Sequence, residues 1–293
     1  MRRRLAAAWV ACAILLAAGL AAAGEVTLTF YHTSDIHEHA APLARIAQFV
    51  KDQRAAGKNV VLVDTGDWFN KGELTDLGTR GEAMATLMGA MGYDAIIPGN
   101  HDYAHGADRL AELIDKHSLP VLAANCSWPE GATPKGVRPF KILTFDGVKV
   151  AVIGTATPNI GNASAPLLTV RPIADSVKPL VEKLGQEADI VVLLTHLGPP
   201  DDKVLIAAMP RVDVLFGGHH HKRFAKLNYD AKHQTVLQHS GFFGQHIGEV
   251  VITWDGEKVT GRTARLIKVE PAMPECPKVQ AIRARYLPAQ TKP

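Results

Sequence analysis

Short apolar segments alternate with amphipathic segments along most of this chain. Leu43, Ile46 and Val50 repeat at the spacing of one helix face, whereas 190–194 is apolar throughout, as expected for a buried central strand. This alternation predicts a mainly parallel sheet covered by helices. The predicted strands are 26–31, 60–63, 95–97, 121–124, 190–194 and 212–216, and the predicted helices are 42–56, 82–91, 107–117 and 174–185.

Two parts of the sequence predict antiparallel strands. The apolar runs 142–145 and 148–153 flank Asp146-Gly147, a strong hairpin turn. The last third continues with the predicted strands 236–239, 249–254 and 259–266. Because no linker divides the chain, we read 24–270 as one α/β domain with two sheets. The proline-rich tail 271–293 has little periodicity, and we expect it to wrap around the domain or fray.

The first 23 residues resemble an export signal. Three arginines, Arg2 to Arg4, precede the apolar stretch 5–20, and Ala21-Ala22-Ala23 supplies a small-residue cleavage site. The alternative is a membrane anchor, but the stretch is barely long enough to span a bilayer. We therefore expect residues 1–23 to be a cleaved signal peptide, leaving a periplasmic or secreted protein with no stable membrane anchor.

Removing this segment changes the charge balance. The 32 Lys and Arg residues fall to 29, equal to the 29 Asp and Glu residues, so the net charge of +3 becomes zero. A balanced surface argues against nucleic-acid binding through bulk charge. Two cysteines remain, Cys126 and Cys276, and the sequence leaves open whether they pair.

Metal-competent side chains follow five of the predicted strands. Because the carboxyl ends of parallel strands meet at one edge of a sheet, these residues are expected to converge there. They lie in the segments Ser34-Asp35-Ile36-His37, Asp64-Thr65-Gly66-Asp67, Gly99-Asn100-His101-Asp102, Thr195-His196 and Gly217-Gly218-His219-His220-His221.

The spacing within these segments predicts metal binding. In extended chain, residues two apart point to the same side, so Asp35 with His37, and His219 with His221, can each address one centre. Imidazole and carboxylate ligands suit Zn, Mn, Fe, Co or Ni better than Ca. The candidate ligands outnumber the needs of one ion, so we expect two, with Asp67 bridging them through its two oxygens. Taken singly, each segment has an ordinary explanation, such as a helix cap or a solvated loop.

Together these motifs resemble the calcineurin-like metallophosphoesterase superfamily. Within it, Thr33-Ser34-Asp35-Ile36-His37, Gly66-Asp67-Trp68-Phe69 and Ala123-Ala124-Asn125 are most similar to the catalytic domain of the 5′-nucleotidase branch. The resemblance spans roughly 25–265. It implies a four-layer αββα sandwich of two mixed sheets, which is an α/β fold, with a centre for two divalent transition-metal ions.

The resemblance also implies roles for individual residues. Asp35, His37, Asp67 and His221 would hold one ion, and Asp67, Asn100, His196 and His219 the other. His101 would stabilise developing charge or protonate the leaving oxygen. The implied reaction is hydrolysis of small phosphate monoesters or diesters, nucleotides among them, by in-line attack of a metal-bound hydroxide.

This sequence differs from the 5′-nucleotidase branch in two ways, which limit the functional properties that the resemblance implies. Secreted nucleotidases of that branch grip the base with a further C-terminal domain, which we do not expect here. The family often reads Asn-His-Glu-x-Asp, but Ala104 stands where the histidine-orienting Asp would be. The rival functions are therefore a thiosulfate-ester hydrolase on the same centre, or a non-catalytic metal- or ligand-binding protein. The substrate, the native metals, the oligomeric state and any protein partner stay open.

Overall fold

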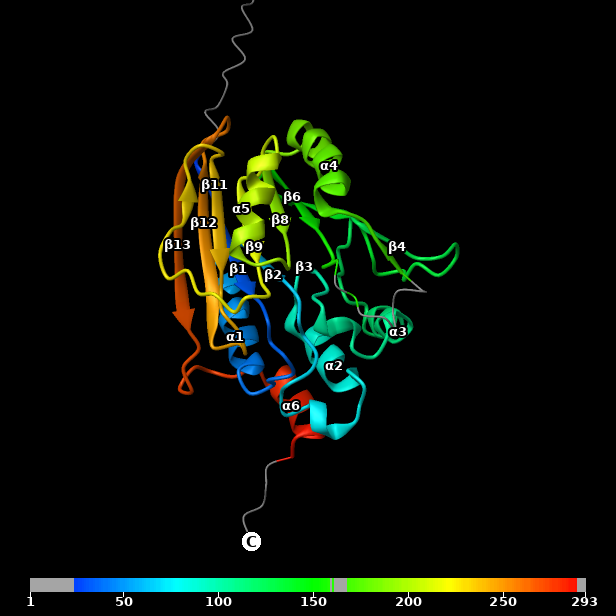
Figure 1. Ribbon diagram of the computed structural model, residues 1–293. Helices are drawn as coiled ribbons and strands as arrows, with labels where there is room; N and C mark the ends of the chain where they lie inside the picture. The colour runs from blue at the N-terminus through cyan, green and yellow to red at the C-terminus, as the bar shows by residue number, and fades with distance from the viewer. Residues whose placement is uncertain (1–23, 159, 161–167, 289–293) are drawn as a thin grey trace, which may run out of the picture.

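Two sheets packed face to face form the centre of the molecule (Figure 1). The structure is a computed structural model and describes residues 24–158, 160 and 168–288. The first sheet has the strand order β13-β12-β1-β2-β3, with β1, β2 and β3 parallel. Its strands are β1 (Val26–Thr33), β2 (Asn59–Asp64), β3 (Ala95–Ile96), β12 (His246–Trp254) and β13 (Val259–Lys268).

The second sheet has the strand order β10-β11-β9-β8-β6-β5, and its four inner strands are parallel. Its strands are β5 (Phe140–Phe145), β6 (Val148–Gly154), β8 (Ile190–Leu194), β9 (Val214–Gly217), β10 (Tyr229–Asp230) and β11 (Thr235–His239). A small separate ribbon pairs β4 (Cys126–Ser127) with β7 (Thr169–Val170).

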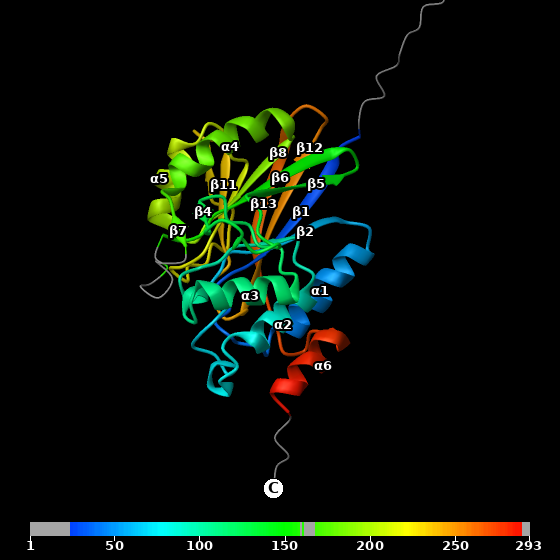
Figure 2. The same ribbon diagram turned by 90° about the vertical axis from the view of Figure 1, so that its right-hand side faces the viewer.

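Helices cover the outer face of each sheet, as Figure 2 shows, with α4 and α5 on one side and the remaining helices on the other. The predicted four-layer αββα sandwich of two mixed sheets is confirmed. The helices are α1 (Leu43–Ala55), α2 (Glu82–Met91), α3 (Ala107–His117), α4 (Ile173–Glu187), α5 (Pro199–Ala208) and α6 (Pro277–Tyr286), with single 3₁₀ turns η1 (Thr75–Leu77) and η2 (His101–Tyr103).

Both faces of the inner strands are buried, which explains their continuous apolar sequences. In β1, Leu28 and Phe30 point into the layer between the sheets, whereas Tyr31 points to the helices. In β8, Val192 lies between the sheets and Val191 under α4 and α5. Alternate side chains of a strand thus fill two different cores.

Three segments differ from the sequence-based expectation. The segment 121–124, predicted as a strand, forms only single parallel bridges at Val121 and Leu122. Helix α5 was not predicted, because its two leading prolines read as a loop; proline is nevertheless well suited to the first helical turn. Helix α6 lies in the tail 271–293 and packs on α1 and α2, where Val279 is fully buried.

The predicted signal peptide, residues 1–23, lies outside the described residues. Among the residues that the structure does describe, no helix is long and apolar enough to cross a bilayer. Cys126 and Cys276 are both free thiols, so they do not form a disulfide with each other.

Candidate metal centre

The predicted ligands converge at the carboxyl ends of the parallel strands of both sheets. Six of them form two neighbouring groups, in each of which the potential ligand atoms lie within 4.8 Å of one another. A third group overlaps both and includes His101. The first two groups are Asp35, His37 and His221, and Asp67, His196 and His219; the third is His37, Asp67 and His101.

In the first group, the backbone fixes which ring nitrogen of His37 is free. Nδ1 of His37 lies 3.2 Å from the carbonyl oxygen of Phe69, which can only accept, so Nδ1 carries the proton. The lone pair of Nε2 then faces Nε2 of His221 at 3.2 Å, and His221 Nε2 lies 3.5 Å from Asp35 Oδ1. Two imidazole nitrogens and one carboxylate oxygen therefore surround a common point.

In the second group, the backbone likewise determines which ring nitrogen of His196 is free. Its Nδ1 donates to the carbonyl oxygen of Thr65 at 2.6 Å, and its Nε2 lies 3.2 Å from Asp67 Oδ2. Nε2 is buried and has no hydrogen-bond partner among the described residues. In a neutral ring its lone pair therefore faces a carboxylate, a repulsive arrangement that a proton or a metal cation relieves.

Asp67 lies between the two groups. Its Oδ2 is 3.2 Å from His196 Nε2 and 3.7 Å from His37 Nε2, whereas its Oδ1 accepts the backbone N–H of His101 at 2.8 Å. The single oxygen Oδ2 thus faces both groups. The bridging of two ions by both oxygens of Asp67 stays a prediction, because Oδ1 can accept this hydrogen bond and still offer its second lone pair to a cation.

Asn100 is the seventh predicted ligand, and its side chain supplies a further test of fit. Its Oδ1 is buried and finds no hydrogen-bond partner within the described part of the chain. Buried amide oxygens are normally paired, so an unpaired one on a residue that follows β3 suits a ligand atom for a divalent cation. Together with the unpaired Nε2 of His196, this oxygen shows that the residues present fit metal ions.

Burial dominates the electrostatics of the centre. It raises the pKa of Asp35 to about 6 and lowers the pKa of His37 to about 4. Burial also opposes the charged form of His196, but its contacts with Asp67 prevail and raise its pKa to about 9. The same pairing holds the pKa of Asp67 below its usual range, against the effect of its burial. Positive charge, from a proton or a metal, is thus favoured between Asp67 and His196.

The local backbone of the ligands is left-handed rather than extended. Positive φ angles of 50–76° occur at five of the seven predicted ligands: Asp35, His37, Asp67, His219 and His221. Such strain in non-glycine residues is typical of functional sites. The extended-chain argument for the paired residues is therefore wrong. Tight turns direct the ligands, and His219 and His221 fall in different groups.

His101 lies at the edge of the first group. Its ring packs edge-on against His37, with ring centroids 4.8 Å apart, and burial lowers its pKa. Neither ring nitrogen of His101 has a hydrogen-bond partner among the described residues, and the exposed Ala104 offers none. Its position is therefore set by its backbone bond to Asp67 and by ring packing.

One loop of the centre was missed by sequence reasoning. Directly after β11, the N–H of Phe243 donates to the carbonyl oxygen of Asp35 at 2.8 Å, and its ring stacks on His39. The neighbouring ring of Phe242 stacks on His221, and Arg223 lies over that ring at 5.2 Å. The available signal was a further strand end, followed by two aromatic residues between Gly241 and Gly244.

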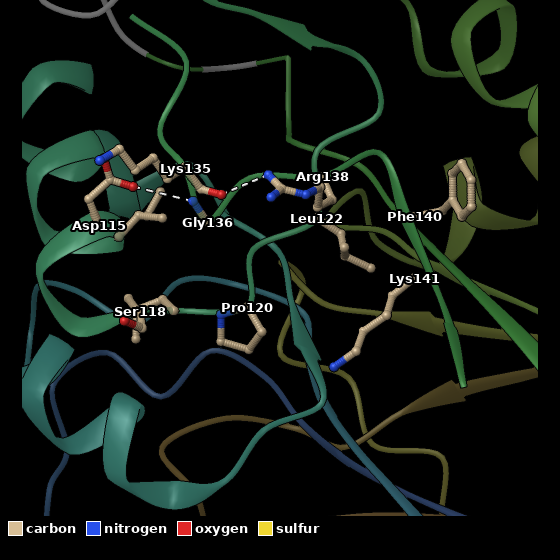
Figure 3. Close-up of a pocket in the computed structure, with 11 residues that line it drawn as sticks. Asp115, Ser118, Pro120, Leu122, Lys135, Gly136, Arg138, Phe140 and Lys141 are labelled. Carbon is tan, nitrogen blue, oxygen red and sulfur yellow. Dashed lines mark hydrogen bonds between the residues drawn. The ribbon is translucent and has the colours of Figure 1, made fainter. Parts of the chain in front are cut away.

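A cavity of about 600 Å³ lies elsewhere, between the end of α3 and the start of β5 (Figure 3). It is lined by Leu122, Arg138 and Phe140, among others, and by none of the predicted ligands. Concavity alone therefore does not identify the metal-competent site; side-chain chemistry does.

Comparisons with known proteins agree with this geometry. The uncharacterized metallophosphoesterase YunD of Bacillus subtilis is 26% identical over 81% of this chain and 53% of its own length. A 5′-nucleotidase of Diplobatis ommata is 30% identical over 70% of this chain and 39% of its own length. The chain thus spans about half or less of these curated relatives.

Among solved structures, a 5′-nucleotidase precursor from Thermus thermophilus superposes with a TM-score of 0.80 at 23% identity. The match covers 89% of this chain and 58% of that one, and it supports the fold. Residues 28–223, which carry all seven predicted ligands, match the calcineurin-like phosphoesterase family. The chain therefore belongs to the calcineurin-like phosphoesterase family.

Proposed function

We propose that this chain is an exported phosphoesterase that uses two divalent metal ions to hydrolyse small phosphate monoesters or diesters. The observation that carries the proposal is the pair of neighbouring ligand groups with Asp67 Oδ2 facing a histidine of each. Family membership and the metal-competent residues support metal-dependent hydrolysis. The arginine-led apolar segment 1–23 supports export.

The ligands divide into two sets in this proposal. Asp35, His37 and His221 hold one ion, and Asn100, His196 and His219 hold the other, with Asp67 common to both. Bound there, divalent ions supply Lewis-acid activation of water and neutralise charge on the phosphoryl oxygens. Carbonyl groups of Phe69 and Thr65 keep the correct nitrogens of His37 and His196 available.

His101 acts on the substrate in this proposal rather than on the metals. Within the described part of the chain its ring nitrogens have no hydrogen-bond partner, and its ring packs edge-on against His37 at the edge of the centre. A protonated ring can donate to a phosphoryl oxygen or to the leaving oxygen. Because burial lowers the pKa of His101, such a proton would be acidic and readily transferred.

Nucleotides are the first substrates to try, because two of the similar proteins described above bear the name 5′-nucleotidase. The test is a substrate panel on protein recovered from the periplasmic and secreted fractions and reconstituted with Mn²⁺ or Zn²⁺. It contains nucleoside monophosphates, p-nitrophenyl phosphate, its bis-ester and a thiosulfate ester.

Hydrolysis of a phosphate ester is expected, and it should disappear in Asp67→Asn. Protein found only in the cytoplasm would contradict export. Cleavage of the thiosulfate ester alone would replace the proposed reaction by the rival one. If the metal-loaded protein cleaves none of these substrates, the remaining interpretation is a non-catalytic metal- or ligand-binding protein.

A further inference from the structure

Asp102 follows His101 in sequence, yet its side chain takes no part in the contacts of the His101 ring. It is almost fully buried, and its carboxylate accepts four backbone N–H groups. Oδ2 accepts from Gly99 at 2.7 Å and from Asp67 at 2.9 Å; Oδ1 accepts from Trp68 at 2.7 Å and from Phe69 at 3.2 Å. These main-chain donors occupy all four lone-pair sites that the two oxygens offer.

These four donors come from two different loops. Asp67, Trp68 and Phe69 follow β2, whereas Gly99 follows β3. The first loop carries the shared ligand Asp67, and the second carries Asn100, next to Gly99. One buried carboxylate therefore joins two of the three loops that present ligands from the first sheet.

The two loops are also packed tightly against each other near the Asp102 carboxylate. The N–H of His101 donates to Asp67 Oδ1 at 2.8 Å. A Cβ on Gly99 would collide with Asp67 Oδ1, and one on Gly66 would collide with the backbone of Gly99. Because the two loops are tightly packed, the Asp102 carboxylate that joins them sets the distance between the Asp67 and Asn100 side chains.

We propose that Asp102 is a positioning residue that holds Asp67 and Asn100 at the separation needed to bind metal ions. This proposal rests on the proposed function, because it assumes that both side chains are ligands. It assigns to Asp102 a task separate from that of its neighbour His101. Asp102 acts through the main chain of the loops and does not touch the substrate.

The test replaces the acceptor by a group of the same shape. In Asp102→Asn, an NH₂ group faces the backbone donors in place of one oxygen, so the two loops should separate. Metal affinity, measured by calorimetric titration of the metal-free protein with Mn²⁺ or Zn²⁺, is expected to fall ~10–100-fold. This readout needs no substrate and no turnover.

Asp213→Asn is the matched control. Asp213 is also a buried carboxylate that accepts a backbone N–H, from Val191 at 2.8 Å, but it precedes β9 and lies outside the ligand groups. Both variants should lower the melting temperature of the metal-free protein, and only Asp102→Asn should lose metal affinity. If Asp102→Asn does not fold, Asp102→Ser, which keeps one acceptor oxygen, provides the same comparison.

Three results would decide between the proposals. Unchanged metal affinity in the folded Asp102 variant would overturn the positioning role. A wild-type protein that binds metal ions but cleaves no ester would overturn the proposed function alone. A wild-type protein that binds no divalent ion would overturn both.

Discussion

Main-chain carbonyl groups determine the chemistry of two key histidines. The carbonyl oxygens of Phe69 and Thr65 can only accept, so each holds a proton on Nδ1 of His37 or His196. The Nε2 atoms are thereby left to bind a cation. This selection is made by backbone atoms, and any residue types at positions 65 and 69 could in principle supply it.

Two substitutions separate the metal-binding and catalytic roles. Asp67→Asn weakens the oxygen shared by the two groups, so both metal content and activity should fall. His101→Asn should keep the metal ions and lower kcat by ~10²–10⁴-fold, the usual range for a lost acid–base group. Elemental analysis and steady-state kinetics on the same preparations check this. A loss of metal in His101→Asn equal to that in Asp67→Asn would make His101 a ligand.

The sequence predicted the convergence of the ligands but not the way in which they converge. Strand ends are visible as apolar runs, so Asp35, Asn100 and His196 could be placed at one sheet edge. The left-handed turns at Asp67 and His219 carry only a weak signal, because Asp and His adopt a positive φ more often than most residues but far less readily than glycine. The role proposed for Asp102 was hidden for a related reason: three of its four partners are backbone groups of another loop.

At the scale of elements, strongly periodic segments were predicted best. The helices α1, α2 and α3 and the central strand β8 follow from their apolar patterns. Helix α6 does not, because its sequence is polar around most of its circumference and only Val279 is fully buried. Tertiary contacts with α1 and α2 hold it, among them the N–H of Cys276 donating to the carbonyl of Ala44 at 2.8 Å. Such contacts cannot be seen in a local pattern.

Val279 is therefore expected to anchor α6. Val279→Ala removes two buried methyl groups and leaves a cavity, which should lower the free energy of unfolding by about 2 kcal/mol. Urea denaturation of the purified protein measures this loss. Gln280→Ala, at an exposed position of the same helix, should change it by less than ~0.5 kcal/mol. Equal effects of the two substitutions would show that α6 does not depend on this contact.

At the scale of the whole molecule, the centre draws on both sheets. Asp35, Asp67 and Asn100 follow strands of the first sheet, whereas His196 and His219 follow strands of the second. The backbone N–H of His219 donates to Asp35 Oδ1 at 3.1 Å, which joins the two halves directly. Bound metal ions would add further links across the same junction.

Metal removal should consequently lower the stability of the whole fold. Ions present at a hundred times their dissociation constant stabilise the native state by ~2.7 kcal/mol, which for a chain of this size corresponds to a melting temperature higher by ~5–10 °C. Calorimetry with and without a chelator measures the difference. Asp67→Asn should show a much smaller shift, and an identical shift in both proteins would indicate metal binding elsewhere.

Because the ligands are divided between the two sheets, we expect metal binding to follow the docking of the sheets during folding. Neither sheet alone carries the first or the second ligand group, because Asp35 and His37 need His221, and Asp67 needs His196 and His219. A chain whose sheets have not yet met can therefore capture an ion only weakly. We therefore expect metal ions to bind after the sheets have docked, and so to slow the unfolding reaction while leaving the folding rate almost unchanged.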